Sequence, residues 1–194
     1  MMNKTYIETI KIVDNKADNL EYHQARYENV LNHLGIEEIK KLDEHIQPPD
    51  WGFYRCKITY GKDIFEIEYF PYKKREISKL KIIFDNEIEY DKKASNREKL
   101  NQLFEQRDEA DDVLIIKNLL VTDTTIANIA FYKDGIWVTP KSPLLKGTTR
   151  ARLLDKGKIV EVDIKVQELR GFSQVALLNA MIDFDILEKC EFLI

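Results

Sequence analysis

The residues best suited to chemistry lie in the stretch from Asp111 to Leu154. Gly147, Thr148 and Thr149 stand where a helix would begin, so free backbone N–H groups, two hydroxyls and the positive end of the helix dipole would face an anion there. Asp123 occurs in an apolar, hydroxyl-rich strand segment, where an unpaired carboxylate would be costly. A ligand with a phosphate dianion and a protonated ring nitrogen would satisfy both features, and pyridoxal phosphate (PLP) is such a ligand.

Each of these features also has an ordinary structural explanation. Asp123 could cap a turn beside the neighbouring threonines, because Asp and Thr side chains bond readily to nearby backbone groups. Thr148 and Thr149 could serve to begin a helix, a role that is compatible with binding an anion. The motifs on either side of these residues favour the functional interpretation.

A series of short motifs occurs in one order along this stretch. The series is Val121-Thr122-Asp123, Ala127-Asn128-Ile129, Lys133-Asp134-Gly135, Thr139-Pro140 and Leu145-Lys146-Gly147-Thr148-Thr149-Arg150. No single motif is specific, but their order and spacing together resemble the class IV aminotransferases, which are fold-type IV PLP enzymes. That family includes branched-chain and D-amino acid aminotransferases and aminodeoxychorismate lyase. The resemblance extends from about Tyr6 to Phe184.

The resemblance implies an arginine that binds the cofactor phosphate. The family has an H-x-x-R motif on its first helix, and this chain has His23-Gln24-Ala25-Arg26 there. A guanidinium offers paired donors and a permanent charge, which suit a phosphate. Arg26 is therefore the predicted phosphate ligand, and His23 is predicted to be structural. Without the resemblance, the same residues would indicate a solvent-exposed helix face.

The resemblance also selects the lysine that would form a Schiff base with PLP. In the relatives a K-x-x-[DN]-R run precedes L-N-x-L-F. Here Lys93-Ala94-Ser95-Asn96-Arg97 precedes Leu100-Asn101-Gln102-Leu103-Phe104. This match predicts Lys93 as the catalytic residue, with Lys92 directed to the opposite side of an extended segment. The alternatives are that Lys92 is the nucleophile or that both lysines are surface charges in a linker.

Four further residues complete the predicted cofactor site, which needs no metal. Asp123 would pair with the pyridine nitrogen and keep the ring an electron sink, although most relatives carry glutamate there. Thr148 and Thr149 match the Gly-x-Thr-Arg segment that would bind the phosphate. Asn179 lies where relatives have a Thr-Gly-Thr or Asn-Ala turn that lines the phosphate, and its alternative is a structural turn asparagine.

The implied fold class is α+β, the fold-type IV architecture of two domains. We expect a small, shortened N-terminal α/β domain in residues 1–90 and a larger, barrel-like, PLP-binding C-terminal domain in residues 91–194. The chain is shorter than full-length relatives, and the shortening falls mostly in the small domain, which shapes the substrate pocket. An aromatic residue that follows the lysine in branched-chain aminotransferases is missing here, which weakens that assignment.

Composition argues against several other classes of protein. The chain has 194 residues, of which 44% are hydrophobic, and a net charge of −4. It can bury a sizeable core and lacks the basic stripe of a nucleic-acid-binding protein. No run approaches the ~20 apolar residues of a membrane span, and the N-terminus does not resemble a signal peptide. Two cysteines argue against a zinc site or a disulfide framework and favour a cytoplasmic location. The resemblance implies a homodimer.

Hydrophobic periodicity and turn residues predict the secondary structure. Strands are expected over 5–13, 53–60, 63–69, 80–84, 113–116, 158–162, 175–180 and around 182, with a hairpin at Gly61-Lys62. Helices are expected over 19–34, 36–42, 98–110, 150–154 and, as a single turn, 166–169. The apolar C-terminus, 192–194, is expected to pack against the protein.

Three functions follow from these observations. The first is a PLP-dependent class IV aminotransferase, similar to D-amino acid aminotransferase, that acts on a small amino acid or 2-oxo acid. The second is an aminodeoxychorismate lyase, which would use the same lysine and release pyruvate. The third is a shortened, catalytically silent relative that acts as a binding protein, motivated by the reduced small domain.

Overall fold

The computed structural model describes residues 4–194, which form two compact units. The first unit consists of the residues up to Lys74 together with Lys92–Asn96, and the second consists of Arg75–Asp91 and Arg97–Ile194. The chain therefore passes from one unit to the other three times, and the domain boundary expected after residue 90 lies one residue from one of these passages. Helices and strands mix in the way that the α+β class requires, so the predicted fold class is confirmed.

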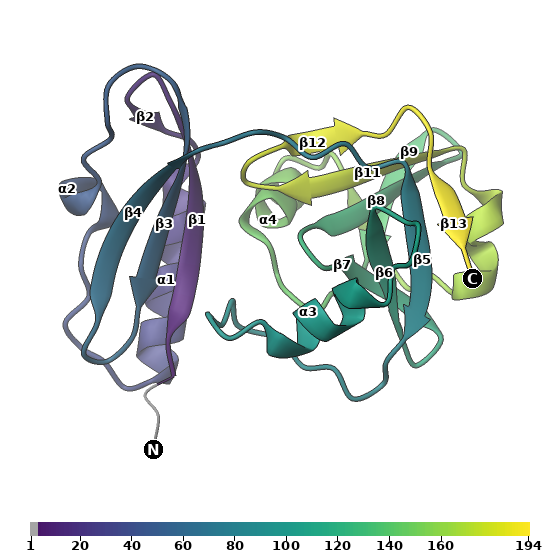
Figure 1. The fold of residues 1–194 in the computed structure, drawn as a ribbon, viewed down its shortest axis with the longest axis horizontal. Coiled ribbons are helices and arrows are strands. Elements are labelled where there is room, and N and C mark those ends of the chain that lie inside the picture. The colour runs from purple at the N-terminus through teal and green to yellow at the C-terminus, as the bar shows by residue number, and fades with distance from the viewer. Residues whose placement is uncertain (1–3) are drawn as a thin grey trace. The chain divides into compact units, whose positions relative to one another are not determined.

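The first unit is a four-stranded antiparallel sheet with a helix on one face (Figure 1). Its strand order is β2 (Lys16–Ala17), β1 (Tyr6–Val13), β3 (Phe53–Tyr60) and β4 (Phe65–Pro71), and its helices are α1 (Leu20–His33) and α2 (Leu42–His45). Strand β1 alternates between buried and half-buried side chains because every second residue faces the core. The inward residues of β1 and β3 pack with Tyr27, Val30 and Leu31 of α1.

The helix expected over 36–42 is wrong. Gly35 ends α1 with a φ of 70°, and the chain then runs without helical structure until α2 begins at Leu42. The carboxamide of Gln24 explains this course, since it donates to the carbonyl oxygen of Lys40 (3.0 Å) and accepts from the N–H of Leu42 (2.8 Å). These bonds satisfy backbone groups that a helix would otherwise have paired.

The second unit is built on one nine-stranded sheet. The strands are β5 (Lys79–Phe84), β6 (Asp112–Lys117), β7 (Leu120–Thr124), β8 (Asn128–Lys133), β9 (Ile136–Pro140), β10 (Val160–Val162), β11 (Gln174–Asn179), β12 (Asp183–Ile186) and β13 (Glu191–Leu193). The order is β10-β9-β8-β7-β6-β5-β13, and β11 pairs with β8 and β12. The helices are α3 (Glu98–Glu105), α4 (Thr148–Asp155) and the short 3₁₀ helix Val166–Gly171.

Strands β6 and β8 lie inside the sheet (Figure 1), and both contribute buried residues to the core of this unit. Their continuous apolar runs are buried, as expected for interior strands that are covered on both faces. The C-terminal strand β13 pairs in parallel with β5, and Phe192 packs against the core, as expected, whereas Ile194 is 92% exposed. Helix α3 ends at Glu105, earlier than expected, because the following residues form turns in which Asp108 has a φ of 51°. Within residues 4–194, no helix is long and apolar enough to cross a membrane.

Candidate active site

The most unusual group in the second unit is the carboxylate of Asp123, on β7. The residue is 4% exposed. One of its oxygens accepts from Nδ2 of Asn128 (2.7 Å), and the other accepts from the backbone N–H of Leu145 (2.9 Å). Burial raises the pKa of Asp123 to about 7, because the bonds from Leu145 and Asn128 and the charge of Arg150 offset burial only in part. Both hydrogen-bond partners are neutral, so the site would gain from a cationic partner.

Asn128, the first residue of β8, connects Asp123 to the start of helix α4. Its Nδ2 also donates to the carbonyl oxygen of Leu145 (2.7 Å). A Cβ atom on Gly147 would lie 2.1 Å from Oδ1 of Asn128, far inside van der Waals contact. Only glycine therefore allows the backbone before α4 to approach Asn128 this closely.

The N-terminus of α4 has the features expected of an anion site. Gly147 is the residue before the helix, and the first intrahelical bond runs from the N–H of Ala151 to the carbonyl oxygen of Gly147 (2.9 Å). The N–H groups of Thr148, Thr149 and Arg150 precede that bond and lie at the positive end of the helix dipole. Thr148 and Thr149 are buried, and among residues 4–194 neither hydroxyl forms a hydrogen bond. The predicted start of a helix at these residues is confirmed.

Asn179 lies at the end of β11, next to Leu178, which pairs with Asn128. Its carboxamide oxygen accepts from the N–H groups of Met181 (2.9 Å) and Ile182 (3.1 Å), and its Nδ2 donates to the carbonyl oxygen of Ile126 (3.2 Å). The side chain thus holds a turn in place. Its predicted contact with a phosphate stays a prediction.

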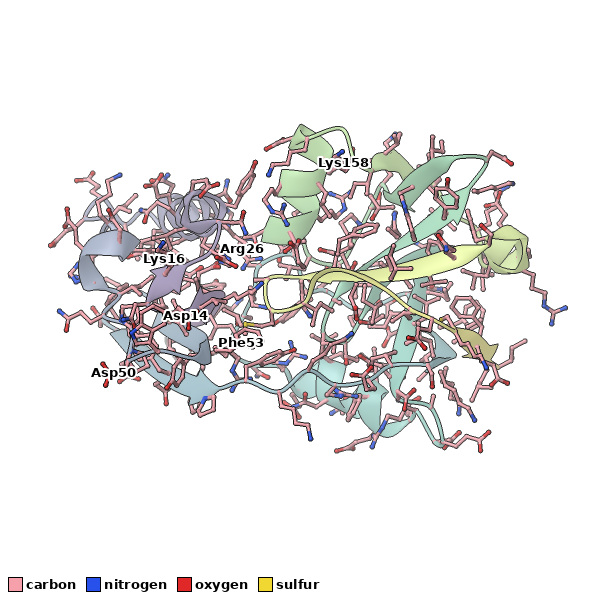
Figure 2. The ribbon with its side chains drawn as sticks, turned by 90° about the horizontal axis from the view of Figure 1, so that it is seen from above. Asp14, Lys16, Arg26, Asp50, Phe53 and Lys158 are labelled. Atoms are coloured by element: carbon pink, nitrogen blue, oxygen red, sulfur yellow. The ribbon has the colours of Figure 1, made fainter. Side chains whose placement is uncertain are left out.

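Arg26 lies on α1 in the first unit, and Figure 2 labels it. Its Nε and Nη2 donate to the two carboxylate oxygens of Glu8 on β1, at 2.8 Å and 2.6 Å. Nδ1 of His23 also binds Glu8 (2.7 Å). Glu8 is completely buried. Burial raises the pKa of Glu8, but Arg26 and His23 outweigh burial and lower it to about 2. In the structure the guanidinium of Arg26 binds this carboxylate, and its contact with the cofactor phosphate, which the resemblance implies, stays a prediction.

His23 is buried and has the structural environment that the sequence suggested. Burial lowers the pKa of His23, against the bond to Glu8, and the positive charges of Arg26 and Lys93 lower it further. The bond between Nδ1 of His23 and the carboxylate of Glu8 (2.7 Å) fixes the orientation of the ring.

Lys93 belongs to a short segment that is attached to the edge of β1. The N–H of Ile7 donates to the carbonyl oxygen of Lys93 (2.8 Å), and the N–H of Ser95 donates to that of Thr5 (2.9 Å). Ala94 forms an antiparallel bridge with Tyr6. Lys93 is thereby brought close enough to His23 for its charge to act on the imidazole.

The structure thus gathers the predicted residues into two groups. In the second unit, Asp123 and Asn179 lie around Asn128, and Thr148 and Thr149 directly follow Gly147, which packs against Asn128. In the first unit, Arg26 and Lys93 lie around the buried pair of Glu8 and His23.

Sequence reasoning did not assign a role to Asn128 or Glu8. Both carry a signal, since each is a polar residue at a position where the strand pattern places a buried side chain. Glu8 follows Tyr6 and precedes Ile10 on the inward face of β1. Asn128 begins the apolar run of β8. A buried polar side chain requires hydrogen-bond partners, so this pattern could have indicated a network around each residue.

The polar groups of the second unit are chemically suited to bind PLP. A buried carboxylate with only neutral hydrogen-bond partners suits a protonated pyridine nitrogen, and unbonded N–H groups with two buried hydroxyls suit a phosphate. Among the residues that the structure describes, no cluster of three His, Cys, Asp or Glu side chains could hold a metal ion.

Comparison with known proteins identifies the family to which these features belong. The amino-transferase class IV family model matches residues 5–184, so the chain belongs to this family of PLP-dependent aminotransferases and lyases. A protein of Haemophilus influenzae is 37% identical over 180 residues, which cover 90% of this chain and 96% of the relative.

The solved structures that are similar to this chain include two with informative names. A provisionally named 4-amino-4-deoxychorismate lyase from Haemophilus somnus has a TM-score of 0.83 and 34% identity, over 93% of this chain and 98% of that chain. A hypothetical aminotransferase from Mycobacterium tuberculosis, in its PLP-bound form, has a TM-score of 0.77 and 14% identity, over 96% of this chain and 81% of that chain, and shares the fold. Because the first of these is matched over nearly its whole length, the shortened architecture is not peculiar to this chain.

The environment of Asp123 predicts a stability that depends on pH. An acid whose pKa rises on folding destabilises the folded state as pH increases from its ordinary pKa of 3.8 to its folded pKa of about 7. At about 1.4 kcal/mol per pKa unit, the loss is on the order of 4 kcal/mol. Asp123→Asn in the PLP-free protein should therefore gain stability relative to the unchanged protein as pH rises from 4 to 8. Urea unfolding at each pH measures this difference. A difference that does not change with pH would show that the carboxylate is not held at a raised pKa.

The contact of Gly147 with Asn128 predicts that adding a methyl group at Gly147 lowers the stability of the protein and weakens PLP binding. Gly147→Ala would push Asn128 away from Asp123, because the added Cβ would lie 2.1 Å from Oδ1. We expect a loss of about 1–3 kcal/mol in the free energy of unfolding, in the range of overpacked sites, and weaker PLP binding. Gly171→Ala is the matched control, since a Cβ there meets nothing within 4 Å. Equal stability and equal PLP affinity of the two variants would contradict the proposed packing.

Proposed function

We propose that this protein binds PLP and uses it to transform an amino acid at its Cα atom. The observation that carries the proposal is the buried carboxylate of Asp123, whose hydrogen-bond partners are both neutral. Such a group destabilises the PLP-free protein, and a protonated pyridine nitrogen would compensate its charge. The family match supports the same cofactor, since class IV aminotransferases are PLP enzymes.

We assign each predicted residue a role in this reaction. Lys93 is the amine that attaches the cofactor covalently and that moves the proton at the substrate Cα. Asp123 holds the ring nitrogen. Thr148 and Thr149 bind the phosphate through hydroxyls and helix N–H groups, and Arg26 contributes guanidinium donors to it. Asn179, in the turn at the end of β11, is a further ligand of the phosphate.

Bound PLP would supply an electron sink for the negative charge that develops at Cα. The residues of the chain set the protonation of the ring nitrogen and the orientation of the groups that bind the phosphate. The carboxylate of Asp123 keeps a proton on the ring nitrogen, because an ionised partner favours the charged form of the ring. The bidentate bonds to Glu8 hold the guanidinium of Arg26 in one orientation, so fewer side-chain conformations must be lost when it binds an anion.

Two reactions remain as finer candidates. The resemblance of the motifs favours an aminotransferase that acts on a small amino acid or 2-oxo acid. The similarity to the Haemophilus somnus protein over nearly its full length favours an aminodeoxychorismate lyase, which releases pyruvate. Release of pyruvate from aminodeoxychorismate, without an added 2-oxo acid, would distinguish the lyase from the aminotransferase. A homodimer and a cytoplasmic location are further proposals that rest on the family resemblance.

The central test is covalent attachment of PLP to Lys93. The protein is incubated with PLP, reduced with borohydride and digested, and the modified peptide is identified by mass spectrometry. We expect the label on Lys93, together with an absorbance band near the edge of the visible range that borohydride removes. Lys93→Ala should lose both the band and at least about 10³-fold in activity, because no other group would replace the amine.

Lys92→Ala is the matched control, since it removes the neighbouring lysine from the same segment. It should keep the band and the label. A label on Lys92 in the unchanged protein would transfer the catalytic role to that residue. If neither lysine is labelled and PLP is not bound, the protein is a catalytically silent relative.

A further inference from the structure

A four-residue turn, Thr124–Ala127, joins the strand that carries Asp123 to the strand that begins with Asn128. The turn is closed by a bond from the N–H of Thr124 to the carbonyl oxygen of Ala127 (3.0 Å), and the hydroxyl of Thr124 accepts from the N–H of Ala127 (3.1 Å). Because Asp123 and Asn128 lie at its two ends and bind each other, the position of this turn sets the position of the carboxylate.

Three long-range contacts from different parts of the second unit hold this turn. Nη2 of Arg97, before α3, donates to the carbonyl oxygen of Thr125 (2.7 Å). The hydroxyl of Thr125 donates to Oδ1 of Asp112, at the start of β6 (2.6 Å). Asn179 donates to the carbonyl oxygen of Ile126 (3.2 Å). The carbonyl oxygens of both central residues are thus bound by side chains that are distant in sequence.

This arrangement lowers the stability of the unit. Asp112 is completely buried, and its Oδ2 has no hydrogen-bond partner among residues 4–194. Burial raises the pKa of Asp112, against the bonds from Thr125 and Val113. A buried carboxyl with an unsatisfied oxygen is destabilising, and an apolar residue at this position would avoid that cost. A role in positioning the turn explains why a carboxyl occupies this site.

We propose that Arg97 and Asp112 are positioning residues, which act through Thr125 to fix the carboxylate of Asp123. Arg97 reaches the turn from a point only four residues after Lys93, so one short segment carries the predicted nucleophile and also fixes the partner of the ring nitrogen. We call the contacts of Arg97 and Asp112 with Thr125 the clamp. Its importance for cofactor binding rests on the proposed function, whereas its effect on the position of Asp123 does not depend on that function.

The first test uses the PLP-free protein and follows the Asp123 carboxyl carbon by ¹³C NMR during a pH titration. Arg97→Met removes the guanidinium, and Thr125→Val removes the hydroxyl with little change of shape. In both variants the turn should loosen and water should reach Asp123, so its pKa should fall from about 7 by one unit or more. Arg150, the charged group that acts on Asp123, is unchanged in each.

Arg107→Met is the matched control, because Nη1 of Arg107 also donates to a backbone carbonyl of the same unit, that of Phe104 (3.0 Å). It should leave the titration of Asp123 unchanged. An unchanged titration in Arg97→Met as well as in Thr125→Val would overturn the proposal. Two variants are used so that the failure of one to fold does not remove the test.

The second test is a double-mutant cycle on PLP binding. Arg97→Met should weaken PLP binding by about tenfold when Asp123 is present and should have no further effect in the Asp123→Asn protein, because both changes remove the same interaction. Equal losses in the two backgrounds would show that Arg97 acts independently of Asp123. If the unchanged protein does not bind PLP, the proposed function fails, and the NMR titration still decides whether the clamp exists.

Discussion

The second unit is organised around a carboxylate that is buried without a charged hydrogen-bond partner. Asp123 is held by Asn128 and by the backbone of Leu145, and these two contacts join three parts of the chain: β7, β8 and the segment before α4. The close approach of Gly147 to Asn128 follows from the same contacts. An ionised carboxylate is expensive to bury, and under the proposed function the protonated ring nitrogen of PLP would compensate its charge. The N-terminus of α4 would then offer donors for the phosphate.

The buried carboxylate of the first unit, Glu8, differs from Asp123 because it has charged partners. Glu8 is fully buried, yet its pKa is lowered to about 2, because the guanidinium of Arg26 and the imidazole of His23 outweigh the effect of burial. The guanidinium of Arg26 is held in one orientation by its two bonds to Glu8. The segment that carries Lys93 is attached to the edge of the same strand, β1, through Ile7 and Thr5. A single strand thus positions both the predicted nucleophile and the predicted phosphate ligand of this unit.

The sequence predicted most strands, because alternation and turn residues are local properties. Strand β3 was predicted at its observed bounds, and a helix was expected to begin at Gly147-Thr148-Thr149, where α4 starts at Thr148. The helix over 36–42 was wrong, since the backbone groups there bind the side chain of Gln24, a contact that no local pattern reveals. The attachment of residues 92–96 to β1 is likewise a long-range pairing.

The chemistry of the site was predictable only in part. The same argument that singled out Asp123, a polar residue in an apolar strand, applies to Glu8 and Asn128. Their partners could not be deduced, because those partners lie far away in sequence. Arg97 was visible only as a motif residue, and its contact with Thr125 depends on the fold.

The most direct test of the claim that Asp123 holds a protonated ring nitrogen is ¹⁵N NMR of the protein loaded with PLP labelled at the pyridine nitrogen. The chemical shift should be that of a protonated nitrogen at neutral pH and should move to that of an unprotonated one in Asp123→Asn. A shift typical of an unprotonated nitrogen in the unchanged protein would contradict the role given to Asp123, and with it the reason for burying this carboxylate.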